Sequence, residues 1–382
     1  MVGRRPAAAR AGAGDHGGPA RGLLSQAQPA RGSHPPRGCR RGRALPGVRP
    51  LGQDHGLHDH RGRRRARSVP PVTPVSPATR FGAFLSVHSP QEQWDLVRRV
   101  EALGFDSVWC GDHVSFNLPL WESLTLLASY ASITTRIRLG SAVYLLALRP
   151  PAVAAKVTAT LDALSGGRLI FGVGVGGENP KEFDACGVPH RERGARVTEA
   201  IDVVRTLWRD TPASFKGRFT QFDGVSIDPK PAQKPGPPIW VGGRSDAALA
   251  RAGRQGDGWV SYVVTPARYR QSLEKIRAAA ASVGRGLDGF ATAHLTFITV
   301  GRDYERARSA WVARLSKRYA QDFGPLADRY GVIGTPEQCA AQLAEFRDAG
   351  CTYFLLNAIC EPPNEREQLE LIAAEVLPRL RR

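Results

Sequence analysis

Three short stretches of this 382-residue chain combine residue types that could do chemistry. The first, GFDSVWCGDHV (104–114), carries an apolar run that ends in Asp112 and His113. An imidazole can accept or donate a proton near neutral pH, and an adjacent carboxylate can fix its tautomer. The pair is therefore a candidate for moving a substrate proton. The alternative is an aspartate that caps the next turn beside a solvated histidine.

The second stretch, FGVGVGGENPKEF (171–183), places four glycines at the end of an apolar run, followed by Glu178 and Asn179. Glycines let backbone amides approach a ligand closely, and tight packing between strands would also require them. Gly172 to Gly177 spell GxGxxG, but these glycines lie within the strand instead of opening a helix. A Rossmann dinucleotide site is therefore a weak match.

The third stretch is IWVGGRSDAALARAG (239–253). An apolar run ends in Gly242 and Gly243, and Arg244 follows. Ser245 or Asp246 can cap a helix whose free backbone amides favour an anion. A phosphate there would meet backbone donors, a positive helix end and a guanidinium. The alternative is an ordinary capped helix with a surface arginine.

These stretches belong to a unit that recurs along the chain. An amphipathic segment, a glycine and an apolar run appear in that order in QWDLVRRVEALGFDSVW, TATLDALSGGRLIFGVGVG, ALARAGRQGDGWVSYV and AAQLAEFRDAGCTYFLLN. The order indicates a helix, a glycine cap and a buried strand. Because the runs are apolar nearly throughout, they are typical of parallel strands covered on both faces.

Further strands are expected in FGAFL (81–85), RIRLGSAVYLL (136–146), PPIWVGG (237–243) and ATAHLTFITV (291–300), which brings the count to eight. Eight units predict an α/β fold, a (β/α)8 TIM barrel over residues 80–382. One insertion, 215–238, reads as a hairpin followed by a proline-rich connector. Functional residues of such barrels lie where strands end, so the three stretches should meet at one rim.

Residues 1–79 have a different composition and are expected to form a disordered basic arm. The first eighty residues contain 16 Arg, no Lys and 3 acidic residues, with few aromatic or β-branched side chains. RGRRRARS (61–68) could bind nucleic acid or an anionic membrane, or the arm could be a targeting segment, although no apolar region follows it. Alternatively the arm is not translated, since Met1 is the only methionine and initiation could fall at Val72 or Val75.

The body has 37 basic and 32 acidic residues beyond position 80, and this small excess does not favour nucleic acid as its partner. It has no CxxC pair and no histidine spacing typical of ligands, so no metal site is expected. No apolar run reaches about 18 residues, which argues against a membrane span. The chain has no signal peptide, so we expect a cytoplasmic protein with free thiols, Cys110 and Cys351 filling the core.

The order of these motifs resembles that of the bacterial-luciferase-like flavin oxidoreductases, particularly the branch that uses the deazaflavin coenzyme F420. The resemblance covers residues 80 to 380 and leaves the arm out. It implies a (β/α)8 barrel with a flavin or deazaflavin across the carboxyl ends of the strands. It also implies hydride transfer at C5 of F420, or oxygen chemistry through FMN.

The resemblance also implies roles for individual residues. Those near the ring and the substrate proton are Asp112, His113 and Glu178, and Ala142–Val143 match a non-prolyl cis peptide against the ring. Gly176, Gly177 and Asn179 match residues that make backbone and amide contacts. Gly242, Gly243 and Arg244 match the site that binds the cofactor phosphate. An extra glycine before Glu178, and Asn117 in place of a tryptophan, depart from the sugar-phosphate dehydrogenases of the family.

The sequence therefore predicts an enzyme that transfers a hydride between F420 and a small organic substrate. The rival within this fold is an FMN-dependent monooxygenase served by a separate flavin reductase. A rival of another class is a nucleic-acid-binding protein that acts through its arm. A homodimer is expected, because such barrels often dimerise, and the substrate is not identified.

Overall fold

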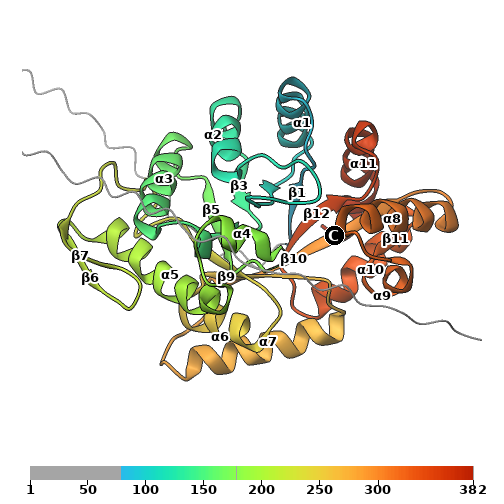
Figure 1. Cartoon of the computed structure of the whole chain (residues 1–382). Coiled ribbons are helices and arrows are strands. Elements are labelled where there is room, and N and C mark those ends of the chain that lie inside the picture. Colours follow the sequence, from blue (N-terminus) through green and yellow to red (C-terminus); the bar gives the residue numbers. More distant parts are fainter. Residues whose placement is uncertain (1–78, 178, 382) are drawn as a thin grey trace, which may run out of the picture. The chain divides into compact units, whose positions relative to one another are not determined.

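The structure is a computed structural model that describes residues 79–177 and 179–381 (Figure 1). Its eight barrel strands are β1 (Arg80–Phe84), β2 (Ser107–Cys110), β3 (Arg138–Ser141), β5 (Leu169–Gly174), β8 (Ile239–Gly242), β9 (Gly258–Tyr262), β10 (Ala291–Val300) and β12 (Tyr353–Ala358). Each pairs in parallel with the next, and β12 pairs with β1. The predicted TIM barrel is confirmed. The predicted arm, residues 1–79, lies outside the described residues except for Thr79.

Helices surround the strands in Figure 1. The longer ones are α1 (Pro90–Ala102), α2 (Ser123–Ile133), α3 (Pro151–Leu164), α5 (Arg193–Arg209), α6 (Asp246–Gln255), α7 (Pro266–Ala281), α8 (Tyr304–Tyr319) and α10 (Pro336–Asp348). The shorter ones are α4 (Pro180–Ala185), α9 (Ala327–Tyr330), α11 (Glu365–Leu371) and α12 (Leu377–Leu380). Single turns of other helix types cover Leu146–Leu148, His190–Glu192, Gly324–Leu326, Pro362–Asn364 and Ile372–Val376.

Helix α1 shows how the repeated unit folds. Ser89 and Glu92 form a capping box, and Pro90 occupies the first turn, where its missing N–H costs nothing. Leu96 and Val100, on the inner face, are buried against the barrel. Gly104, with φ of 81°, then lets the chain turn back toward β2.

Two tryptophans fill the barrel interior. Trp109 and Trp240 stack with ring centroids 5.2 Å apart, and both rings lie close to glycines of neighbouring strands. A Cβ on Gly140 would stand 2.2 Å from the Trp109 ring, and one on Gly258 would stand 2.6 Å from the Trp240 ring. The barrel interior around these two rings is therefore packed.

The predicted insertion is a hairpin, as expected, formed by the antiparallel strands β6 (Ala213–Lys216) and β7 (Gln221–Val225). A second addition was not predicted. Between β10 and α10 the chain forms α8, α9 and a short strand β11 (Val332–Gly334), which pairs with the end of β10. A further short strand, β4 (Tyr144–Leu145), continues the path of β3 and pairs with β5.

The five cysteines of the described residues are free thiols, and Cys110 and Cys351 are buried in the core as predicted. Within residues 79–177 and 179–381, no helix has the length and apolar character needed to cross a membrane. The same residues contain no group of three or more histidine, cysteine or acidic side chains that could hold a metal ion.

Candidate active site

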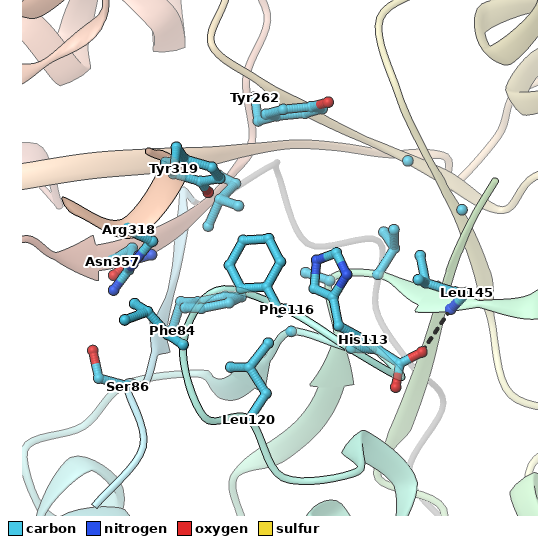
Figure 2. A pocket seen from close by; sticks show the side chains of 18 of the residues that line it. Phe84, Ser86, His113, Phe116, Leu120, Leu145, Tyr262, Arg318, Tyr319 and Asn357 are labelled. Carbon is cyan, nitrogen blue, oxygen red and sulfur yellow. Dashed lines mark hydrogen bonds between the residues drawn. The ribbon is translucent and has the colours of Figure 1, made fainter. Parts of the chain in front are cut away.

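A cavity of about 430 Å³ opens where the barrel strands end (Figure 2). Residues from all three predicted stretches line it, namely Asp112, His113, Gly176, Gly242 and Gly243. The expectation from the sequence that the three stretches meet at one rim therefore holds for these five residues. The walls are mostly apolar, formed by Phe84, Phe116, Leu118, Leu120, Leu145, Val260, Tyr262, Leu295 and Phe297.

His113 is held from one side by a carboxylate that the sequence did not single out. Its Nδ1 lies 3.1 Å from Oε2 of Glu182, whose side chain is fully buried. The other oxygen of Glu182 accepts the backbone N–H groups of Val114 and Ser115, at 2.6 and 3.1 Å. A carboxylate in this position accepts a hydrogen bond from Nδ1–H and so favours the tautomer whose Nε2 carries no proton. The imidazole also stacks on Phe116, with ring centroids 4.2 Å apart.

Asp112 makes contacts of a different kind. Both of its oxygens accept from Arg149, at 2.5 and 2.9 Å, and one also accepts from Ser123 Oγ. The backbone N–H of Leu145 donates to the other, the bond dashed in Figure 2. This side chain therefore ties the end of β2 to β4, to α2 and to the start of α3. From the sequence, Asp112 was the residue expected to orient the His113 ring. That interpretation is corrected here, since the carboxylate at Nδ1 belongs to Glu182.

The peptide bond between Ala142 and Val143 is cis, as the resemblance implied, and both residues line the cavity. The Val143 side chain lies between two glycines of neighbouring strands. A Cβ on Gly174 would stand 2.3 Å from Val143 Cγ2, and one on Gly242 would stand 2.6 Å from Val143 Cγ1. These glycines therefore make room for Val143, which is the packing alternative raised for the glycine-rich stretch.

The remaining residues of the glycine-rich stretch fall into two groups, one that lines the cavity and one that does not. Gly176, with φ of 64°, lines the cavity, but Gly177 and Asn179 do not. Asn179 caps α4 by accepting from Lys181 N, and its amide donates to the carbonyl of Ser115. Glu178 lies outside the described residues, so its predicted catalytic role stays a prediction.

Arg244 lies beside the cavity, in a neighbouring depression of about 530 Å³. Its guanidinium donates to the carbonyl of Val263 and stacks over Tyr262, which lines the main cavity. Two further arginines, Arg268 and Arg329, line the same depression. The cavity and the depression are lined by consecutive residues at two places. Gly243 and Tyr262 line the cavity, and the next residues, Arg244 and Val263, line the depression. The depression is therefore suited to bind the anionic part of a ligand whose other part lies in the cavity.

Sequence reasoning missed several polar residues of the cavity, among them three from α8 and one from β12. Arg314, Arg318 and Tyr319 come from α8, and Asn357 comes from the end of β12. A signal for Asn357 was present, because an amide at the end of the apolar run CTYFLLN occupies the same place in its unit as His113 does. No comparable signal marked α8, whose sequence carries charges around most of its surface.

The other histidines of the body do not line the cavity. His294 lies in the wall of the barrel beside Ser261, and burial lowers its pKa to about 3, so it stays neutral. His88 is hydrogen bonded to Glu365 at 2.5 Å. His190 contacts Arg193. Of the four, His113 is the one whose position suits proton transfer to a ligand.

The closed barrel and a cavity lined by strand-end residues define a TIM-barrel enzyme whose active site lies at the carboxyl ends of the strands. The model of the luciferase-like monooxygenase family matches residues 72–353. The chain belongs to this family, and it is an oxidoreductase of the luciferase-like kind.

Among curated proteins, the chain is 29% identical over 339 residues to an F420-dependent glucose-6-phosphate dehydrogenase of Nakamurella multipartita, covering 80% of this chain and 97% of that one. It is 26% identical over 325 residues to a 5,10-methylenetetrahydromethanopterin reductase of Archaeoglobus fulgidus, covering 75% and 94%. Among solved structures, an F420-dependent secondary alcohol dehydrogenase in complex with an F420-acetone adduct has a TM-score of 0.72 at 23% identity, covering 80% and 99%. This last likeness shows the fold alone.

Proposed function

We propose that the protein transfers a hydride between coenzyme F420 and a small organic substrate. The single observation that carries this proposal is the His113 imidazole, which the buried Glu182 orients inside a cavity at the barrel rim. The F420-dependent activities in the names of two curated relatives support the choice of cofactor.

The residues present fit such a cofactor. A cavity of about 430 Å³ lies within the range of roughly 300 to 1,000 Å³ common for small-molecule sites. Its apolar walls suit a flat ring, and Ala142, Val143 and Gly176 supply backbone there. F420 continues beyond its phosphate into a tail of carboxylates, whereas FMN ends at the phosphate. The adjoining depression with its three arginines therefore favours F420 over FMN.

When bound, F420 supplies the carbon that accepts or donates the hydride. The chain's own contribution is to hold the substrate against it, to exclude water and to move one proton. For an alcohol substrate, Nε2 of His113 would take the hydroxyl proton as the carbon loses its hydride. Glu182 would keep the imidazole in the tautomer that can do so. Phe116, Leu118 and Leu120 would keep water away from this proton.

Three cofactor contacts and two carboxylates remain part of the proposal. Gly242, Gly243 and Arg244 would hold the phosphate, because Gly243 has φ of 130° and the capped start of α6 follows directly. Asp112 would act by positioning the loops around His113. Glu178 would add a second carboxylate to the proton path.

A homodimer in the cytoplasm is also part of the proposal. Val153, Val157 and Leu164 on α3 are exposed at 56%, 39% and 70%, and their spacing gives them one helix face. A second copy of the chain would cover such an apolar strip. Free thiols agree with a reducing compartment.

The second candidate function is an FMN-dependent monooxygenase served by a flavin reductase, which the family's description favours. The test is an equilibrium titration of the protein with F420 and with FMN, followed by fluorescence, together with oxygen uptake. Saturable F420 binding without oxygen uptake is expected. Oxygen consumption with reduced FMN, and no F420 binding, would replace the proposal by the second candidate.

A further inference from the structure

Two arginines of α8 reach the cavity. Arg314 and Arg318 are one helical turn apart and both line it. In Figure 2, Arg318 and Asn357 lie at one end of the cavity and His113 lies toward the other, with Phe116 between them in that view. A ligand that touches both ends therefore needs an apolar middle.

Positive charge at this end exceeds the negative charge available to balance it. Arg314 has one carboxylate partner, Glu361, at 3.7 Å, and that side chain is 65% exposed, so solvent screens the pair. Within the described part of the chain, no carboxylate lies within ion-pair distance of Arg318. Glu365 is a buried acid whose charge acts on Arg318, and it is already hydrogen bonded to His88 and to Ser86 N.

Buried polar atoms at the same end also have no partner. Nε of Arg314 and Oδ1 of Asn357 are buried and make no hydrogen bond to any described residue. Asn357 is only 1% exposed, yet it lines the cavity. Because buried polar groups are nearly always hydrogen bonded, this arrangement indicates a ligand with polar atoms here. The amide of Asn357 can turn its NH2 group toward an acceptor.

We propose that the substrate of this enzyme carries an oxyanion, a carboxylate or a phosphate, at the end remote from the reacting carbon, and that Arg318 binds it with Asn357 alongside. The inference rests on the proposed function, since it takes the His113 end as the place of hydride transfer. It makes the substrate class an amphiphilic acid whose apolar body lies along Phe116, and Arg318 a specificity-determining residue.

The test compares ligands that differ only in charge. The full chain is titrated with octanoate, octanamide and octyl phosphate by ligand-observed NMR, with the wild type and with Arg318→Met, Arg318→Lys and Lys317→Met. Lys317 is the matched control, because it is an exposed cation on the same helix turn. The dissociation constant for F420 is measured for each variant in parallel.

We expect the wild type to bind octanoate or octyl phosphate roughly tenfold or more tightly than octanamide, as for a buried charge-assisted contact. Arg318→Met should bring this ratio to about one, Arg318→Lys should restore part of it, and Lys317→Met should leave it unchanged. The phosphate arm decides which oxyanion is preferred. F420 affinity should stay within about twofold in all variants.

Equal binding of octanoate, octyl phosphate and octanamide by the wild type would overturn the inference, as would an unchanged ratio in Arg318→Met. A loss of F420 affinity in Arg318→Met as large as the loss of octanoate affinity would overturn it too, by assigning the arginine to the cofactor. If the wild type shows the charge preference but binds no F420, the proposed function fails while the anion site stands.

Discussion

His113 owes its suitability as a proton carrier to Glu182, a residue 69 positions further along the chain. Glu182 has no exposed surface, and its two oxygens are shared between the imidazole and two backbone N–H groups of the same loop. One carboxylate thus fixes both the loop that carries the histidine and the tautomer of its ring. At metal sites, mutating the hydrogen-bond partner of a histidine ligand typically lowers activity by roughly 10- to 100-fold.

The Glu182→Gln variant tests this assignment. It keeps the shape of the side chain but replaces the oxygen at Nδ1 by a group that can donate, so the ring should change tautomer. We expect kcat to fall by roughly 10- to 100-fold, with KM for substrate and F420 affinity little changed. His113→Ala sets the reference, with an expected loss of about 10²- to 10⁴-fold.

The measurement is steady-state kinetics together with ¹⁵N NMR of the histidine ring, which reports whether Nδ1 or Nε2 carries the proton. A purely structural role for Glu182 would move protein stability and KM but leave the proton on Nδ1. That outcome would remove Glu182 from the proton path. Asp112→Asn is the matched comparison, because Asp112 is equally buried but binds Arg149.

Single residues were predictable from sequence where they end an apolar run. His113, Asp112, Gly176, Gly242 and Gly243 do so, and all five line the cavity. Glu182 and Arg318 are on helices, where nothing local separates a charge that faces the site from one that faces water. Their roles depend on contacts between distant segments, which a sequence pattern does not contain.

At the level of elements, the chain just after β3 has its shape because β5, which pairs with β3, and β8, the next strand along the barrel, carry glycines. Val143 fills the space that a side chain at Gly174 or Gly242 would need. This interlocking links the strand that lines the proposed ring site to the glycine stretch and to the proposed phosphate site. A substitution in one of these three segments should therefore alter the packing of the other two.

Gly174→Ala should destabilise the protein by about 1–3 kcal/mol, because its Cβ would meet Val143 Cγ2 in a packed interior. Removing the obstructing methyl groups in the double variant Gly174→Ala/Val143→Ala should restore part of that loss. Urea unfolding of the two single variants and the double variant gives the coupling energy. Additive losses would mean that the two side chains do not compete for the same space.

Elements were predictable where the pattern was simple. The eight barrel strands follow apolar runs, and the hairpin of β6 and β7 follows its Phe and Gly pattern. The helix α8 and strand β11 were not expected, although both carry side chains of ordinary propensity. Some charged residues of α8, such as Arg314 and Arg318, line the cavity, while others, such as Lys317, are exposed, and no local pattern in the helix separates the two groups.

On the scale of the whole molecule, the contact between His88 and Glu365 joins the first and last units of the barrel. His88 follows β1, and Glu365 begins α11. The hydrogen bond that His88 donates to Glu365 raises the pKa of His88 above its usual value of 6.5, against the opposing effect of burial. The proton is therefore bound more tightly in the folded state than in the unfolded state.

The stabilisation from this proton is complete below the unfolded-state pKa of His88 and is lost as pH rises through its raised folded-state pKa. We expect the wild type to lose stability above pH of about 6.5 relative to His88→Gln, which has no such proton. Urea unfolding at intervals of pH, with both proteins, measures the difference in slope. Parallel curves would show that the contact does not link folding to this proton.

The barrel should not depend on the first 78 residues, because every strand pair that closes it is formed by residues from Arg80 onward. Deleting residues 1–78 should therefore leave the unfolding temperature and F420 affinity unchanged. Residues 1–78 carry 15 of the 53 basic side chains, so the deletion should abolish any salt-dependent retention on DNA. Retention that survives the deletion would assign it to the barrel, whereas a fall in stability would show that the arm packs on it.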